Sequence, residues 1–242
     1  MAVFREEPHS SSSIIWQVKR VNKEKAVCYI VAAGDWYGYK PVPQKQDMII
    51  AVDGGYDTTK ELGLTPDYVI GDFDSIQSTV VQEKTIKLNP MKDDTDTLYA
   101  IKFAKEKGYE TFIVLGGTGG SRISHTVANI QTLLHFPALN IFLIDREEVL
   151  FIVSNGEIVF SKQCKGYISV FSVSDKSIGV TERGLKYEIE EYQLSNSYPI
   201  GVSNEFIGEK GYIAVKDGIL LLGMPCSQLK GIEKLRKGPL EQ

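Results

Sequence analysis

Four aspartates in the first half of the chain could together hold a divalent metal ion. They are Asp53, Asp72, Asp74 and Asp96. Asp72 and Asp74 flank the apolar Phe73, so in an extended turn both carboxylates can point to the same side. Crowded carboxylates repel one another and need a compensating cation, and hard oxygen ligands suit Mg²⁺, which also bridges to phosphate oxygens. The pattern therefore predicts magnesium-assisted phosphate chemistry.

The segment Lys92-Asp93-Asp94-Thr95-Asp96 lies at the start of a predicted helix, which leaves two interpretations open. Its carboxylates could serve the metal, or Asp94 and Asp96 could only cap the helix and complement its dipole. The other acidic residues after predicted strands favour the first interpretation.

A glycine-rich stretch, Gly116-Gly117-Thr118-Gly119-Gly120, is a candidate for phosphate contact. Glycines let the backbone approach a phosphate closely, and a helix that begins near Ser124 would supply free N–H groups. The stretch matches neither a P-loop nor the GxGxxG dinucleotide pattern, so it also fits a simple tight connection. Just beyond it, Arg122 could make a forked contact with a phosphate. His125 could donate to a phosphate, or could be only a cap or packing residue.

The elements that position these residues alternate between buried strands and amphipathic helices. Six apolar runs predict strands, at residues 27–33, 48–52, 68–70, 85–88, 112–115 and 140–144. Helical periodicity predicts helices over 96–107 and 124–134, the second with Val127, Ile130 and Leu134 on its apolar face. The alternation indicates βαβ units and a mainly parallel sheet covered on both sides. Because open parallel sheets bind ligands beyond the carboxyl ends of their strands, we expect the polar segments there to line one cleft.

After residue 148 the helical periodicity stops, and strand patterns replace it. Residues 185–190 alternate apolar and polar side chains, which predicts a strand. Asn155-Gly156 and Asp217-Gly218 each separate two apolar runs, and both dipeptides favour hairpin turns because they tolerate positive φ. We therefore predict an N-terminal extension over 1–25, a three-layer α/β domain over 26–146 and an antiparallel β-sandwich over 147–242.

Composition excludes several classes of protein. The net charge is only -4, and Lys and Arg are scattered, which argues against nucleic-acid binding. The three cysteines lie far apart and indicate reduced thiols in a cytosolic protein, not a disulfide framework or a zinc site. The first residues lack the apolar core of a signal peptide, and no apolar run is long enough to cross a bilayer. We expect a soluble, cytoplasmic protein with no membrane or nucleic-acid partner.

Taken in order, the motifs resemble those of the thiamine pyrophosphokinases. That family carries a DGG turn, then GDFDS, then K-D-x-T-D, then a glycine-rich loop with Arg and a downstream His-x-x-x-Asn, and finally GLKY and G-x-S-N. The corresponding residues here begin at Asp53, Asp72, Lys92, Gly116, His125, Gly184 and Gly201. The resemblance extends from about residue 26 to residue 215. Where the family commonly reads G-G-R-x-D-H, this chain has a loop one residue longer, with Ser124 in place of the acid.

The resemblance implies an ATP-binding α/β domain, a thiamine-binding β-sandwich and a homodimer with active sites between the domains of two subunits. Its implied Mg²⁺ ligands are Asp53, Asp72, Asp74 and Asp96, with Asp53 also near the substrate. Its implied ATP contacts are Lys92, Gly117, Thr118, Gly119, Gly120, Arg122 and His125. Catalysis would depend on Asp72, Asp74, Asp96 and Arg122, and Ser203 and Asn204 would face the thiamine pyrimidine.

Three alternatives use the same residues differently. A related pyrophosphokinase could act on a pterin alcohol, since only the acceptor pocket would differ. A phosphohydrolase could use Asp72 as its nucleophile, although the downstream lysine and acidic motif of such enzymes are not evident. A non-catalytic sensor of thiamine or nucleotide is disfavoured because every expected metal ligand is retained.

Overall fold

The protein is described by a computed structural model. The described residues are 26–37, 39–73, 76, 84–89, 93–121 and 123–238. None of the helices in this part of the chain has the length and apolar character needed to cross a bilayer.

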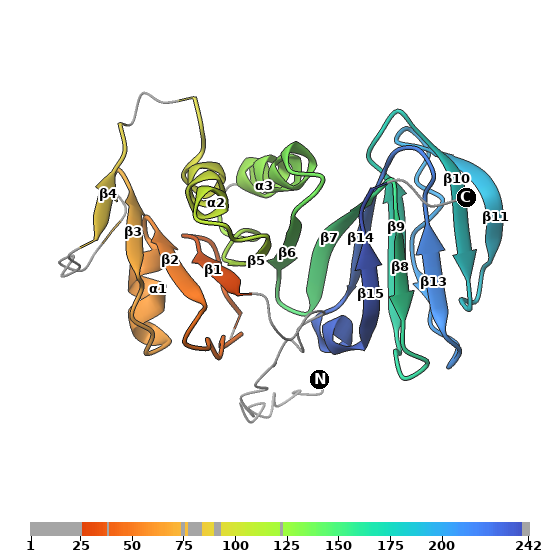
Figure 1. The fold of residues 1–242 in the computed structure, drawn as a ribbon, viewed down its shortest axis with the longest axis horizontal. Coiled ribbons are helices and arrows are strands. Elements are labelled where there is room, and N and C mark those ends of the chain that lie inside the picture. The colour runs from red at the N-terminus through yellow and green to blue at the C-terminus, as the bar shows by residue number, and fades with distance from the viewer. Residues whose placement is uncertain are drawn as a thin grey trace, which may run out of the picture.

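One ten-stranded sheet runs through both halves of the molecule (Figure 1). Its parallel half, in spatial order, is β6 (Asn140–Ile144), β5 (Thr111–Leu115), β1 (Val27–Val31), β2 (Met48–Val52), β3 (Tyr68–Gly71) and β4 (Thr85–Lys87). These are the six predicted strands. Five of them are largely apolar runs, because a parallel strand covered on both faces needs apolar side chains on both, whereas the edge strand β4 exposes Thr85 and Lys87. The sheet continues from β6 into an antiparallel half made of β7 (Glu148–Ser154), β14 (Ile219–Pro225), β9 (Tyr167–Ser172) and β12 (Asn204–Glu205).

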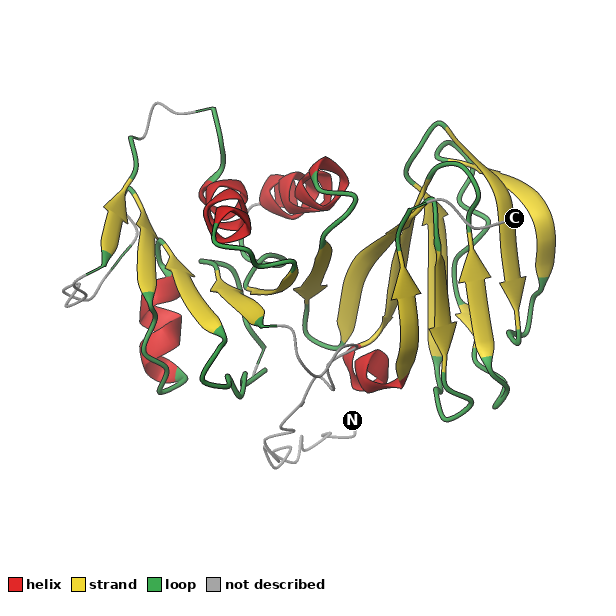
Figure 2. Ribbon diagram, viewed as in Figure 1, coloured by secondary structure: helices red, strands yellow, loops and turns green. Residues whose placement is uncertain are grey.

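Helices cover both faces of the parallel half, which gives the expected three layers (Figure 2). On one face, α2 (Asp96–Glu106) and α3 (Ile123–His135) bury Ile101 and Leu133 against Ile30 and neighbouring side chains. On the other face, α1 (Gly55–Glu61) packs Tyr56 against β2 and β3. The sequence pattern gave no sign of α1, because this helix is short and follows directly from the Asp-Gly-Gly turn.

The predicted apolar face of α3 is partly wrong. Val127 is 52% exposed, while Ile130 and Leu134 pack against the core. The buried positions of the helix are Asn129, Thr132 and Leu133. Two of these buried residues are polar. Because the prediction placed the buried face from the apolar residues alone, it missed them and the face was misplaced by part of a turn.

A second sheet of five strands completes the predicted sandwich. Its order is β11 (Ile189–Ser195), β10 (Lys176–Arg183), β13 (Gly211–Ala214), β8 (Glu157–Phe160) and β15 (Ile232–Arg236), and a 3₁₀ turn (Cys226–Gly231) precedes β15. Phe160 and Ile213 of this sheet share one core with Phe151 and Leu220 of the ten-stranded sheet. That core also includes Leu115 of β5, so it continues beneath the parallel half.

The two predicted hairpins do not form. Asn155-Gly156 connects β7 to β8 and Asp217-Gly218 connects β13 to β14, but in each case the two strands belong to different sheets. The two corners are hydrogen-bonded to each other: Asn155 N donates to Gly218 O (3.0 Å), and Gly218 N donates to Asn155 Oδ1 (2.8 Å). Both residues have positive φ, 42° and 121°. The dipeptides therefore supply the backbone conformation expected of them, but they turn the chain from sheet to sheet.

The predicted strand over 185–190 is largely a turn between β10 and β11. Gly184 has a φ of 68°, and its N–H donates to Glu188 Oε1 (2.6 Å). Leu185 keeps a single bridge to Phe206. This acceptor, four residues further along the chain, closes the loop locally, so the alternating pattern does not extend into a ladder.

We predict that Asn155→Ala lowers the free energy of unfolding by about 1–2 kcal/mol, because it removes a side-chain acceptor and places alanine at positive φ. Asn155→Gly keeps the backbone conformation and should lose only the hydrogen bond. Urea unfolding measures both, and Asn196→Ala, at an exposed asparagine, is the matched control. Equal stabilities of Asn155→Ala and Asn196→Ala would contradict the structural role of the paired corners.

Candidate active site

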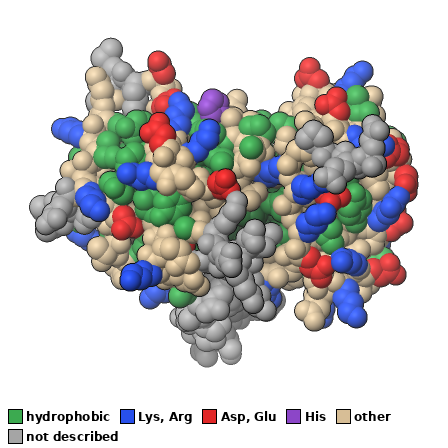
Figure 3. Space-filling model, viewed as in Figure 1, with side chains coloured by type: hydrophobic (Ala, Val, Ile, Leu, Met, Phe, Trp, Pro, Cys, Tyr) green, Lys and Arg blue, Asp and Glu red, His purple; other side chains and the backbone are tan. Residues whose placement is uncertain are grey.

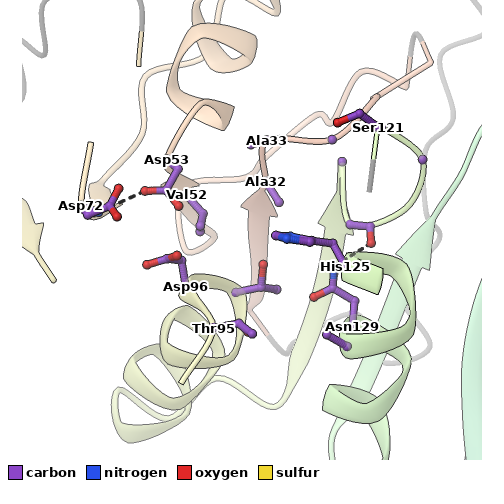
Figure 4. A pocket seen from close by; sticks show the side chains of 17 residues that line it. Ala32, Ala33, Val52, Asp53, Asp72, Thr95, Asp96, Ser121, His125 and Asn129 are labelled. Atoms are coloured by element: carbon purple, nitrogen blue, oxygen red, sulfur yellow. Dashed lines mark hydrogen bonds between the residues drawn. The ribbon is translucent and has the colours of Figure 1, made fainter. Parts of the chain in front are cut away.

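A cleft of about 370 Å³ lies at the carboxyl ends of the parallel strands (Figure 4). It is lined by residues that follow β1, β2, β3 and β5, together with residues at the starts of α2 and α3. This is the position expected for a ligand site of an open parallel sheet. Three predicted metal ligands, Asp53, Asp72 and Asp96, line it together. The other predicted residues Asp74, Lys92 and Arg122 lie outside the described residues.

The backbone fixes the position of Asp53 tightly. Asp53 has a φ of 47°, and its Oδ1 accepts a hydrogen bond from Asp72 N (3.2 Å). Gly71 lies directly beneath, where an added Cβ would approach Asp53 Oδ1 to 1.7 Å. Only glycine therefore allows the end of β3 to pass this close to the carboxylate at the end of β2. The Asp-Gly-Gly turn and the Gly-Asp-Phe-Asp segment form one interlocked unit.

Like charges make the cleft electrostatically unfavourable. Burial raises the pKa of Asp53 to about 7, and the charge of Asp96, a side-chain hydrogen bond with Asp96 and the charge of Asp72 act in the same direction. A hydrogen bond from the backbone of Phe73 partly opposes this rise in pKa. A divalent cation beside these carboxylates would relieve their repulsion.

The carboxylates alone form an incomplete metal site. Within the described ranges, no group of three or more His, Cys, Asp or Glu side chains is arranged to hold an ion. Mg²⁺ fits such a site, because it commonly takes one or two carboxylates and completes its shell with waters and substrate phosphates. The residues present therefore suit a metal that arrives with a phosphate ligand.

The glycine-rich loop after β5 forms the opposite wall of the cleft. Gly116 has a φ of 63°, and an added Cβ there would lie 2.4 Å from Ala32 O, so the loop packs backbone to backbone on the segment after β1. Asn129, one turn after His125 on α3, donates from Nδ2 to Gly117 O (2.6 Å) and is buried. His125 itself lines the cleft, as do Gly117, Gly119 and Gly120.

Sequence reasoning missed Asp35. Its Oδ2 accepts hydrogen bonds from Gly120 N (3.0 Å) and from the Tyr37 hydroxyl (3.3 Å), so it ties the glycine-rich loop to the chain after β1. The signal that could have revealed it is its place just beyond a predicted strand, the same criterion that identified Asp53 and Asp72. Thr118, a predicted ATP contact, is buried and donates from its hydroxyl to Asp145 Oδ1 (2.9 Å), away from the residues that line the cleft.

The predicted residues of the second half lie at another pocket, of about 290 Å³, which Asn204 lines. The Asn204 amide is fully hydrogen-bonded. Nδ2 donates to Glu182 Oε2 (2.9 Å) and Tyr187 O (2.7 Å), and Oδ1 accepts from Tyr187 N (3.0 Å) and Glu205 N (2.9 Å). Ser203 has a φ of 58° and is exposed beside this pocket, with its N–H bonded to Ser169 Oγ (3.1 Å).

Comparisons with known proteins agree in both halves of the chain. A family model described as the thiamin pyrophosphokinase catalytic domain matches residues 39–143, and one described as the thiamin pyrophosphokinase vitamin B1 binding domain matches residues 156–220. Thiamine pyrophosphokinase of Bacillus subtilis (strain 168) is 33% identical over 184 residues, covering 72% of this chain and 85% of that protein.

Solved structures show the same architecture. The crystal structure of thiamine pyrophosphokinase from Bacillus subtilis superposes with a TM-score of 0.71 at 26% identity, covering 82% of this chain and 98% of that one. Yeast thiamin pyrophosphokinase superposes with a TM-score of 0.67 at 16% identity, covering 86% and 89% of the two chains, and so shares the fold.

Asp53→Asn should stabilise the protein above about pH 7. Because the folded-state pKa of Asp53 is raised from 3.8 to about 7, its contribution to stability is fully present below the lower value and is lost as pH rises through the higher one. The amide removes that loss and keeps an oxygen for Asp72 N. Allowing for partial exposure of the carboxylate, we expect a gain of about 1–2 kcal/mol at pH 8 that shrinks towards pH 4. Urea unfolding of metal-free protein across this range measures it.

Asp94→Asn is the control, because Asp94 pairs with Lys102 on the surface of α2 (2.7 Å). This variant should show no gain in stability at high pH. If Asp53→Asn were no more stable than the unsubstituted protein at pH 8, the cost of burying a charged Asp53 beside Asp96 and Asp72 would be refuted.

Proposed function

The chain belongs to the thiamin pyrophosphokinase family and is an enzyme of that activity. We propose that it transfers the β,γ-diphosphate of ATP to the hydroxyl of thiamine. The products are thiamine diphosphate and AMP, and the metal is Mg²⁺. The observation that carries this proposal is the juxtaposition of Asp53, Asp72 and Asp96 with the glycine-rich loop in one cleft. Carboxylates on one wall and glycine backbone on the other suit a metal-bound triphosphate.

We assign different roles to the residues on the two walls of the cleft. Asp53 and Asp96, with Asp72, would hold Mg²⁺, which when bound neutralises charge on the phosphate oxygens. The backbone N–H groups of the loop after β5 and the start of α3 would orient the phosphates, with His125 as a side-chain donor. The thiamine hydroxyl then attacks the β-phosphorus, and AMP departs. We expect Lys92, Arg122 and Asp74 to assist, and Asp74 or Asp96 to be the general base if one acts.

The acceptor is proposed to bind in the pocket lined by Asn204. This pocket lies within the residues matched by the vitamin B1 binding domain, and its walls include Ile189, Leu194 and Ile200. Apolar walls with a few polar groups suit a flat heterocycle. Because the Asn204 amide makes all its hydrogen bonds within the protein, we infer that this residue shapes the pocket. The exposed Ser203 stays a predicted contact of the acceptor.

The same chain is proposed to act as a homodimer in the cytoplasm. The cleft and the second pocket have no lining residue in common, which supports an active site that joins domains of two subunits. Apolar side chains at the second pocket, Tyr187, Ile200 and Val202, are 64%, 45% and 52% exposed and could be covered by a partner. Three buried free cysteines suit a reducing compartment.

The activity is tested by incubating the purified full chain with ATP and an acceptor. We expect AMP and thiamine diphosphate in equal amounts, only when Mg²⁺ is present, and a return to background after chelation. Hydroxymethylpterin in place of thiamine is the competing acceptor. Preferential use of the pterin would overturn the substrate assignment, and tight thiamine binding without AMP would favour a sensor.

Asp72→Asn should lower kcat by about two powers of ten or more, since it removes a major electrostatic group from the phosphate cleft. The matched control is Glu106→Gln, at an exposed position near the end of α2. Initial rates of AMP release at saturating Mg²⁺ provide the measurement. Near-normal turnover of Asp72→Asn would refute the role given to this carboxylate.

A further inference from the structure

A buried carboxylate, Glu182, lies at the edge of the sandwich core. It is 4% exposed and is on β10, where its partners across the sheet are Ile213 of β13 and Ile189 of β11. Residues directly opposite one another in an antiparallel pair point to the same face. Glu182 therefore points to the same side as the fully buried Ile213, into the space between the two sheets.

Within the described residues, Glu182 has one hydrogen-bond partner. Its Oε2 accepts from Asn204 Nδ2 (2.9 Å), which links β10 of one sheet to β12 of the other. The cations closest to it in sequence are paired with other carboxylates: Arg183 with Glu190 and Lys186 with Glu205. Burial raises the pKa of Glu182 to about 7, and the hydrogen bond from Asn204 opposes this only in part. A buried carboxylate without a cation is costly, so the position has a purpose that packing alone does not supply.

The second carboxylate oxygen faces a pocket. Glu182 lines the 290 Å³ pocket with Tyr187, Leu194, Ile200 and Val202. Its Oε1 has no hydrogen-bond partner among the described residues, yet it is not among their buried unsatisfied polar atoms, so it remains accessible from the pocket. The Asn204 amide cannot bind a ligand without giving up an existing bond. Apart from the Tyr187 hydroxyl, Glu182 Oε1 is the side-chain group available for polar recognition there.

We propose that Glu182 determines specificity for an amino-substituted pyrimidine, with Oε1 accepting a hydrogen bond from the exocyclic amino group while Asn204 holds Oε2. This inference rests on the proposed function, in which the acceptor is thiamine. The pocket's apolar walls hold the ring, and the positive charge of the thiazolium favours the ionised carboxylate. In an analogue with an oxo group in place of the amino group, the oxo oxygen and Glu182 Oε1 would both be acceptors. A buried site discriminates strongly against a ligand that leaves its polar group unpaired.

Glu182→Gln tests the proposal, because it keeps the side-chain volume and an oxygen for Asn204 while presenting an N–H donor to the pocket. Calorimetric titration of the full-length chain would compare thiamine with the analogue that carries an oxo group in place of the pyrimidine amino group. We expect the substitution to weaken thiamine binding about ten- to hundredfold and to strengthen binding of the oxo analogue, so that the preference narrows or reverses. In turnover, KM for thiamine should rise by a similar factor, while kcat and KM for ATP change less than about threefold.

Two further variants complete the experiment. Glu190→Gln, at an exposed carboxylate of neighbouring β11, should leave both affinities unchanged. Glu182→Met, which has no strong hydrogen-bonding group, should lose thiamine affinity without gaining affinity for the oxo analogue. An unchanged ratio of the two affinities in Glu182→Gln would overturn the inference alone. Failure of the unsubstituted protein to bind thiamine or release AMP would overturn it together with the proposed function.

Discussion

The burial of neighbouring carboxylates is the constraint on which the cleft depends. Asp53 and Asp96 come from a strand end and a helix start, and burial together with the neighbouring Asp96 raises the pKa of Asp53 to about 7. The protein achieves this with rigid backbone features, namely a left-handed residue at Asp53 and a glycine at position 71 that accepts its close approach. An electrostatically unfavourable arrangement of this kind is typical of sites that bind an oppositely charged ligand. The architecture around the cleft can be understood as the framework that keeps these charges from moving apart.

That framework extends well beyond the α/β domain. The ten-stranded sheet passes without a break from β6 into β7, and the sandwich core reaches beneath β1 and β5 through residues such as Val31 and Leu115 (Figure 1). In Figure 3 the charged side chains of the visible face are spread over both halves, with Lys and Arg interspersed among Asp and Glu. The two halves are therefore joined by a common apolar core and by the hydrogen bonds of one continuous sheet. On this face, neither half carries charge of one sign only.

Much of the parallel half could be predicted from sequence, because strands buried on both faces leave uninterrupted apolar runs and ligand loops follow their ends. The convergence of Asp53, Asp72 and Asp96 follows from the same rule. The antiparallel half was harder to predict. Asn155-Gly156 and Asp217-Gly218 specify positive φ, but local turn chemistry does not say to which sheet the next strand belongs. Asp35 and Glu182 escaped notice because their roles arise from contacts with residues 85 and 22 positions away.

The outer strands of the long sheet limit how one copy can meet another. In the part of the chain that the structure describes, the sheet ends at β12 with two residues and at β4 with three. So few open N–H and C=O groups give little template for adding a foreign strand at either end of this sheet. The five-stranded sheet ends instead at β11 with seven residues and at β15 with five, so its edges offer the longer template for another extended chain.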